Sequence, residues 1–304
     1  MTNDFSWREA LIELAGDRVL CDEPMSRHTT FRIGGKADAF WTPADTDELI
    51  AGLKLLKNAG TAVTILGNGS NVLVRDKGIR GCVVSLAAPI SEIVIDGTVM
   101  TAGAGAILGA VSNKAAEAGL TGLEFAVGIP GSIGGAVYMN AGAYGGEIKD
   151  VLESVSALLP DGELREFSAD EFDFGYRHSV FQENGAVIIA AKFRLAHGDR
   201  EASRKQMNDI QSKRREKQPL EFPSAGSTFK RPPGYFAGTL IDHTGLKGYT
   251  VGGAQVSEKH AGFVVNKGGA TAADVLQLMK DVSDRIYSVH GVHLEPEVKI
   301  IGEE

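Results

Sequence analysis

The stretch that decides the fold of this 304-residue chain reads Gly128-Ile-Pro-Gly-Ser-Ile-Gly-Gly-Ala-Val-Tyr-Met-Asn-Ala-Gly-Ala-Tyr-Gly-Gly146. Seven of its nineteen residues are glycine, nearly all the others are small or apolar, and none is charged. Glycine lets a backbone approach a ligand closely and offer bare N–H groups, which suit a phosphate. A tightly packed turn would explain a lone glycine pair. Seven glycines with Ser132 and Asn140 among them predict a cradle for a phosphate-bearing cofactor.

A second glycine loop, Gly67-Asn-Gly-Ser-Asn71, lies nearer the N-terminus. It follows a strand predicted over Ala62–Leu66 and precedes a strand-like Val72–Val74. Its glycines allow close backbone approach, and Ser70 and Asn71 offer side-chain donors. The alternative is a plain Asn-Gly hairpin turn between two paired strands.

A third glycine segment, Gly103–Gly109, resembles the dinucleotide fingerprint but has three residues where G-x-G-x-x-G has two. A hairpin predicted over Ser91–Ala102 precedes it, instead of a βαβ repeat. We therefore expect no Rossmann site here. The chain also has no P-loop, zinc signature or Ser-His-Asp motif, and no metal site is predicted.

Length and charge limit the possible functions. A chain of 304 residues is longer than one compact core usually holds, so two or three domains are expected. The net charge, 31 − 39 = −8, disfavours nucleic acid as the main partner. It does not disfavour an anionic small molecule, because a basic pocket can sit on an acidic surface.

Several features indicate a cytoplasmic protein that does not insert into a membrane. Four acidic residues within the first twenty argue against a signal peptide, and no apolar run approaches the roughly 18 residues of a membrane span. Cys21 and Cys82 are the only cysteines. They form neither a disulfide framework nor a metal set, and fit a reducing compartment.

Helical and strand periodicities occur in all parts of the chain. Capping residues and apolar spacing predict helices over Asp45–Ala59, Asp199–Lys217 and Thr271–His290. The last of these carries an apolar stripe of Val275, Leu278, Val282, Ile286 and Val289. Further strands are predicted over Thr29–Gly35, Val83–Leu86, Val187–Phe193 and His293–Ile301, with a hairpin around Pro160-Asp-Gly162.

Three polar residues stand where a plain structural role explains them poorly. Arg177 interrupts the aromatic run Phe174–Ser179, and Glu297 lies in a predicted strand where a core would not carry an acid. Ser227 follows Gly226 among small residues, although a turn residue is the simpler interpretation. The residues alone thus predict an enzyme with two diphosphate cradles and candidate Arg, Ser and Glu side chains, without naming its reaction.

Taken together, these motifs resemble the UDP-N-acetylenolpyruvoylglucosamine reductase family, flavoenzymes of peptidoglycan precursor synthesis and hence of cell shape and division. They occur in family order and span nearly the whole chain. The short connection from Arg177 to Val187 resembles the family's shorter type, which lacks a tyrosine-bearing insertion. The matching motifs are Asn68-Gly-Ser-Asn71, Pro130-Gly-Ser-Ile-Gly-Gly135 with Asn140-Ala-Gly142, Tyr176-Arg177, Arg214-x-x-Lys217-x-Pro219, Ala225-Gly-Ser-Thr-Phe-Lys230 and Glu295-Pro-Glu-Val298.

The resemblance implies an α+β fold. It contains an FAD-binding domain of the p-cresol methylhydroxylase type, made of two α+β subdomains, residues 1–86 and 87–215. A C-terminal α/β substrate-binding domain covers 216–291, and the strand 292–304 returns to the first subdomain.

The resemblance also implies which residues meet each ligand. Those carried over to FAD are Gly67, Asn68, Gly69, Ser70, Asn71, Gly131, Ser132, Gly134, Gly135, Asn140 and Arg214. Those carried over to the substrate are Tyr176, Lys217 and Lys230, whereas Arg231 stands where some relatives have Asn. Oligomeric state does not follow from the sequence, and a monomer is favoured.

The implied reaction has two halves. NADPH reduces FAD and leaves, and UDP-N-acetylglucosamine enolpyruvate then receives a hydride at C3 of its enolpyruvyl group. Arg177 and Glu297 are the catalytic residues expected to stabilise charge that develops toward the substrate carboxylate, and Ser227 is the expected proton donor to C2. The alternatives are another FAD enzyme of the same fold, such as an oxidase, and a nucleotide-binding module without activity.

Overall fold

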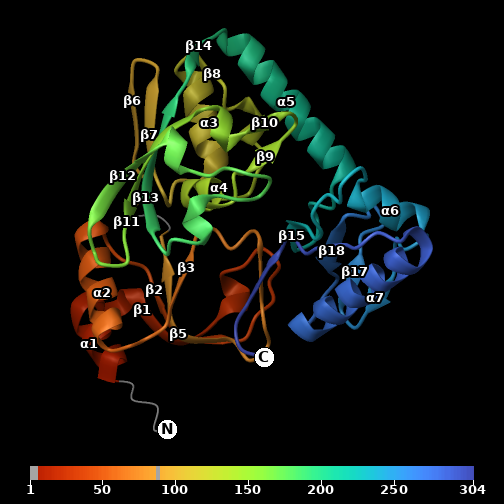
Figure 1. Ribbon diagram of the computed structural model, residues 1–304, viewed down its shortest axis with the longest axis horizontal. Coiled ribbons are helices and arrows are strands. Elements are labelled where there is room, and N and C mark those ends of the chain that lie inside the picture. The colour runs from red at the N-terminus through yellow and green to blue at the C-terminus, as the bar shows by residue number, and fades with distance from the viewer. Residues whose placement is uncertain (1–5, 87–89) are drawn as a thin grey trace. The chain divides into compact units, whose positions relative to one another are not determined.

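The computed structural model describes residues 6–86 and 90–304, which form two compact units (Figure 1). Unit 1 draws its described residues from Met1–Cys21, Ala39–Asn68 and Gly81–Lys213. Unit 2 is drawn from Asp22–Asp38, Gly69–Arg80 and Arg214–Glu304. The finer division predicted at residues 86, 215 and 291 stays a prediction.

The N-terminal part of the chain forms two helices and a four-stranded sheet of order β1-β2-β5-β3. Strands β3 and β5 run parallel, with Leu66 opposite Ser85. The side chain of Asp45 caps the second helix by accepting a hydrogen bond from the Glu48 N–H at 2.8 Å, which confirms the predicted start. The elements are α1 (Ser6–Ala15), β1 (Val19–Pro24), β2 (Lys36–Trp41), α2 (Thr46–Asn58), β3 (Val63–Leu66) and β5 (Ile79–Ser85).

The second part of unit 1 is a five-stranded antiparallel sheet of order β12-β11-β13-β7-β6. Both predicted hairpins are confirmed, because β6 pairs with β7 and β11 pairs with β12. Helix α4 packs against β13 and β7 (Figure 1). The elements are β6 (Ile93–Asp96), β7 (Val99–Gly103), α3 (Leu108–Glu117), α4 (Ile133–Tyr138), β11 (Leu152–Leu158), β12 (Leu164–Ser168) and β13 (Val187–Arg194).

Short elements connect these layers. The long helix predicted after Asp199 is confirmed as α5 (Arg200–Lys217), whose residues from Arg214 onward belong to unit 2. The two-residue strands form pairs, namely β8 (Leu120–Thr121) with β14 (Ala196–His197), and β9 (Gly142–Ala143) with β10 (Gly146–Glu147). The 3₁₀ turns cover Gly16–Arg18, Met25–Arg27, Glu124–Ala126, Ile148–Asp150, Ala169–Glu171 and Val180–Gln182.

A buried carboxylate ties the start of α5 to the turn before α4. Glu124 is only 6% exposed and accepts hydrogen bonds from Thr121 Oγ1, the Gly122 N–H and Ser203 Oγ. Burial raises the pKa of Glu124, but these three donors outweigh burial and bring the pKa below its ordinary value of 4.5. The charge therefore stabilises the fold.

We expect Glu124→Gln to lower the free energy of unfolding by about 1–3 kcal/mol at neutral pH. Because the folded pKa is depressed, the stabilisation is present above pH 4.5 and is lost as the pH falls through the lower folded value. The gap in melting temperature between parent and variant should therefore narrow on acidification below about pH 4.5. Scanning calorimetry measures it, with the exposed Glu117→Gln as control; an equal gap at all pH values would contradict this role.

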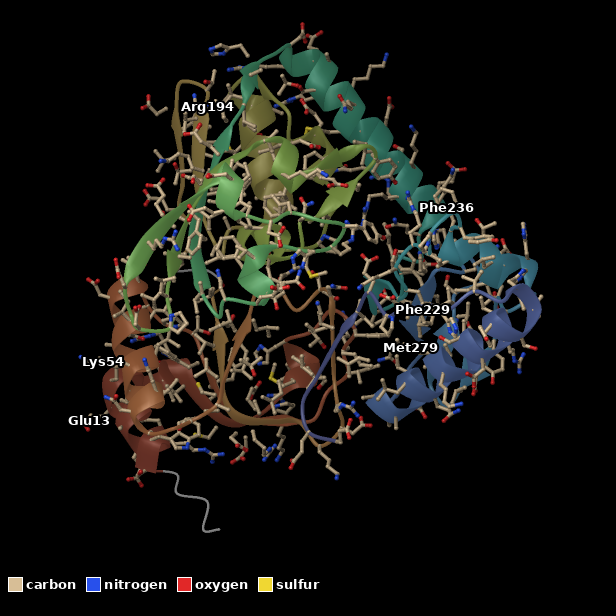
Figure 2. The ribbon with its side chains drawn as sticks, viewed as in Figure 1. Glu13, Lys54, Arg194, Phe229, Phe236 and Met279 are labelled. Carbon is tan, nitrogen blue, oxygen red and sulfur yellow. The ribbon has the colours of Figure 1, made fainter. Side chains whose placement is uncertain are left out.

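Unit 2 has a four-stranded antiparallel sheet of order β15-β18-β17-β16. The helix predicted over Thr271–His290 is confirmed; it begins at a capping box of Thr271 and Asp274 and is followed by Gly291 with φ of 67°. Phe229 and Met279, labelled in Figure 2, belong to its buried core. The elements are β15 (Ser224–Ser227), α6 (Ala237–His243), β16 (Thr250–Val251), β17 (Ala254–Val256), β18 (Phe263–Asn266) and α7 (Ala272–His290).

Some predictions in this unit are wrong. Val289 is 63% exposed, although the other four residues of its predicted stripe are buried. The strand predicted over Thr29–Gly35 is a set of turns, because Thr29 Oγ1 donates to the Ile33 carbonyl and Arg32 has a left-handed φ of 54°. The C-terminal strand β19 covers only Lys299–Ile301 of the predicted His293–Ile301. None of the helices in the described residues is both long and apolar enough to cross a membrane.

Candidate active site

The first two residues of the loop Gly67–Asn71 meet the glycine stretch 128–146 within unit 1. Asn68 Nδ2 donates to the Pro130 carbonyl at 3.0 Å. A Cβ atom on Gly67 would lie 2.4 Å from Ser132 Oγ, so only glycine allows this approach. The end of strand β3 and the start of α4 therefore lie together, although more than sixty residues separate them in the sequence.

The alternative of a simple Asn-Gly hairpin is wrong. Strand β3 pairs with β5, whereas β4 (Val72–Val74) pairs in parallel with β19, so the loop joins two different sheets. Its backbone is tightly constrained, since Gly69 has φ of 59° and a Cβ there would lie 2.1 Å from the His28 carbonyl oxygen. Because this loop is not a hairpin between paired strands, its backbone N–H groups can donate to a ligand.

The donors of this loop fit a diphosphate. In the part of the chain that the structure describes, the N–H groups of Asn68, Gly69 and Ser70 donate to no protein acceptor. In the glycine stretch, by contrast, the N–H groups of Ile133 and Gly134 donate to backbone carbonyls at 2.9 and 2.8 Å. The loop Gly67–Asn71 thus offers N–H donors to a ligand. The glycine stretch mainly lets a ligand come close to the backbone beside the exposed Gly135.

Two residues predicted to bind the cofactor form side-chain hydrogen bonds with the protein itself. Asn71 Nδ2 donates to the Glu297 carbonyl at 3.2 Å within unit 2. Asn140 is 1% exposed, and its Nδ2 donates to Glu147 Oε2 and to the Gly175 carbonyl, both at 3.0 Å. Each amide therefore orders a segment that carries a predicted catalytic residue.

Arg177 lies beside the glycine stretch in unit 1. Its Nη2 donates to the Gly142 carbonyl at 3.3 Å, and its guanidinium lies 5.1 Å from the ring centroid of the half-exposed Tyr176. The positive charge of Arg177 also acts on Glu147. The pKa of Glu147 is lowered mainly by its hydrogen bond with Lys149, and further by Asn140 and by the charge of Arg177.

Ser227 and Glu297 come from adjacent segments of unit 2. The Glu297 N–H donates to the Thr228 carbonyl at 2.8 Å, and Phe229 bridges to Pro296. Ser227 is exposed at the end of β15, opposite Phe263. The structure therefore places these two predicted residues on neighbouring segments.

The register of β15 contains a bulge. Ser224 faces Val265 and Ser227 faces Phe263, so three steps on β15 match two on β18. Gly226, with φ of 76°, supplies the left-handed conformation that this extra residue needs. The bulge sets the direction of Ser227.

The remaining predicted ligand residues lie at the surface of unit 2. Lys230 pairs with Glu295 at 3.2 Å, and Lys217 is exposed at the end of α5, one turn after the partly buried Arg214. Arg231 lies 4.5 Å over the ring of the exposed Phe236, which is labelled in Figure 2. These cations give this unit local positive charge on an acidic protein.

Two residues near the predicted catalytic groups escaped the sequence analysis. Lys299 follows Glu297 by two positions in an extended segment, and burial, followed by the charge of Lys230, lowers its pKa. Gln182 Nε2 donates to the Arg177 carbonyl at 2.9 Å. The two-residue period of a strand could have indicated Lys299, whereas only the folded loop reveals Gln182.

Comparison with known proteins adds names to this geometry. Residues 37–168 match the family described as an FAD binding domain. Residues 218–301 match the UDP-N-acetylenolpyruvoylglucosamine reductase C-terminal domain. The UDP-N-acetylenolpyruvoylglucosamine reductase of Agathobacter rectalis is 56% identical over 94% of this chain and 94% of its own length. The chain belongs to the UDP-N-acetylenolpyruvoylglucosamine reductase family.

Other members of the reductase family agree over the whole length. That of Clostridioides difficile is 46% identical and covers 100% of both chains. The solved structure of the Thermus caldophilus reductase superimposes with a TM-score of 0.81 at 37% identity, over 92% of this chain and 98% of that one. The predicted α+β fold with an FAD-binding domain of the p-cresol methylhydroxylase type is confirmed, and the protein is an FAD-dependent oxidoreductase of peptidoglycan synthesis.

Proposed function

We propose that this protein reduces UDP-N-acetylglucosamine enolpyruvate to UDP-N-acetylmuramate with NADPH as the reductant. The observation that carries this proposal is the pairing of the Ser227 and Glu297 segments in unit 2, at the motif positions that the family resemblance assigns to catalysis. We also infer that residues 216–291 bind the substrate and that the enzyme acts in the cytoplasm. Its exposed free Cys21 suits a reducing compartment.

The FAD pyrophosphate is proposed to lie against the paired glycine loops. The N–H groups of Asn68, Gly69 and Ser70 would donate to its oxygens, and Gly131, Ser132, Gly134 and Gly135 would leave room beside them. Arg214 is the cation assigned to the same cofactor. When bound, FAD supplies the hydride, and the protein supplies binding and orientation.

The chain's own groups would act on the substrate. Lys217, Lys230 and Tyr176 would hold the nucleotide sugar, since cations suit its diphosphate. Arg177 would be aimed at the enolpyruvyl carboxylate, where negative charge develops once C3 has gained a hydride, and Glu297 would donate a hydrogen bond there as a carboxylic acid. Ser227 would then give its proton to C2, and it recovers a proton from water.

Visible spectra test the proposal directly. The purified protein should be yellow, lose its flavin absorbance with NADPH under anaerobic conditions, and regain it on adding the enolpyruvyl sugar. An oxidase of the same fold would instead regain the absorbance rapidly in air without that sugar. A colourless protein that stays colourless with added FAD would contradict the assignment.

We expect Gly135→Val to purify without yellow colour while remaining folded. A Cβ at Gly135 meets only Ser132 Oγ at 3.6 Å, an ordinary contact, so the protein itself has room for it. Loss of FAD would therefore report the space that the cofactor needs. Circular dichroism checks the fold, and Ala110→Val on the exposed face of α3 is the control. Full FAD occupancy in Gly135→Val would place the pyrophosphate elsewhere.

A further inference from the structure

The backbone at Arg177 has a conformation that its own side chain does not favour. Its φ of 57° lies in the left-handed region, which is unfavourable for a residue other than glycine. Such conformations persist only where surrounding groups hold them, and they concentrate at functional sites. The groups that hold the backbone of Arg177 therefore help to set the orientation of its guanidinium.

Asn140 holds the loop from one side. Its Nδ2 donates to the Gly175 carbonyl, two residues before Arg177, and its Oδ1 accepts from the Lys149 N–H at 3.1 Å. The same Nδ2 donates to Glu147 Oε2. Both amide protons and one acceptor site are thus used by the protein, in a side chain that is 1% exposed.

Gln182 holds the same loop through its own side-chain amide. Its Nε2 donates to the Arg177 carbonyl at 2.9 Å and to the Tyr138 carbonyl at 2.8 Å. Ser179 Oγ donates to that same Tyr138 carbonyl at 2.8 Å. The loop is therefore fastened to the C-terminal end of α4, the helix that the glycine stretch forms.

We propose that Asn140 and Gln182 are positioning residues for Arg177, two amides that fix its strained loop to the glycine stretch. Asn140 then acts through protein contacts instead of touching FAD. This inference rests on the proposed function, because it takes Arg177 as the group that stabilises the substrate's developing charge. Fixing the loop through two side-chain amides limits its movement, and a misplacement of about 1 Å typically costs about 10² in rate.

Two isosteric variants remove the amide donors. Asn140→Asp keeps the acceptor for the Lys149 N–H but cannot donate to the Gly175 carbonyl, and Gln182→Met keeps the length of the side chain without its donors. Asn113→Asp is the matched control, since Asn113 Nδ2 donates to the Gly109 carbonyl on α3, away from this loop. Should Asn140→Asp fail to fold because its new charge faces Glu147, Gln182→Met decides alone.

The two half-reactions are measured separately by stopped flow on the FAD-loaded proteins. We expect both variants to be reduced by NADPH at the parent's rate and to be reoxidised by the enolpyruvyl sugar about 10²-fold more slowly. Calorimetric titration should also show weaker binding of UDP-N-acetylmuramate, whose carboxylate Arg177 would meet. A purely structural role would lower the melting temperature and leave both measurements unchanged.

Combining each variant with Arg177→Ala distinguishes a failure of the positioning role from a failure of the proposed function. If the amides act through Arg177, adding either variant to Arg177→Ala causes little further loss in the reoxidation rate. Losses that multiply, or single variants that reoxidise like the parent, would overturn the positioning role and leave the proposed function standing. Normal reoxidation by Arg177→Ala itself would overturn both.

Discussion

Ser227→Ala should accept electrons from NADPH at a near-normal rate and be unable to pass them on quickly. Reduction of FAD requires no proton on substrate carbon, so the flavin should bleach as in the parent. Reoxidation by the enolpyruvyl sugar requires the proton at C2, and loss of a general acid typically costs about 10²–10⁴ in rate. The bleached flavin should persist under anaerobic conditions, which stopped-flow absorbance measures.

Ser224→Ala, at the other end of β15, is the matched control for that variant. Because a serine proton exchanges with water, the parent enzyme in D₂O should place solvent deuterium at C2 and the hydride from NADPH at C3. A variant that reoxidises as fast as the parent, or deuterium found only at C3, would remove Ser227 as the donor. Its loop would then be a simple turn.

The second large effect is expected at the two charged residues. Arg177→Ala and Glu297→Gln should bind FAD and be reduced normally, and each should slow reoxidation by about 10²–10³. Each of these side chains is expected to stabilise charge that exists only during the substrate half-reaction, so its removal should slow that half-reaction alone. The exposed Arg194→Ala and Glu13→Gln, labelled in Figure 2, are controls of matching chemistry. Normal turnover by either test variant would refute that residue's role.

Local sequence signals predicted the long helices α2, α5 and α7, whereas the short helix α4 inside the glycine stretch was not predicted. Asp45 before α2 and the pair Thr271 and Asp274 at α7 make their capping bonds inside a single turn, so the residues that decide the boundary lie side by side in the sequence. The strand expected over Thr29–Gly35 failed for a related reason. A hydrogen bond from Thr29 to Ile33 closes turns there, and apolar alternation carries no sign of it.

The sequence predicted a set of residues for the candidate site, but it could not predict the contacts that those residues make. Motif spacing assigned Asn71, Asn140, Ser227 and Glu297 to the predicted site, and those roles stay predictions. It could not show that the amide of Asn71 binds a carbonyl 226 residues away, or that Asn140 binds one 35 residues away. Such partners are set by tertiary folding, which brings together segments with no local relation.

The bulge in β15 limits how the length of this segment can vary. Three steps from Ser224 to Ser227 match two on β18, so deletion of Gly226 would restore the regular alternation, with Ala225 still buried and Ser227 still exposed. An insertion of one residue would instead add a second unpaired residue to the bulge. Insertions should therefore be rejected here, while the exposed hairpin turn at Pro160–Gly162 can change length freely as the sequence diverges.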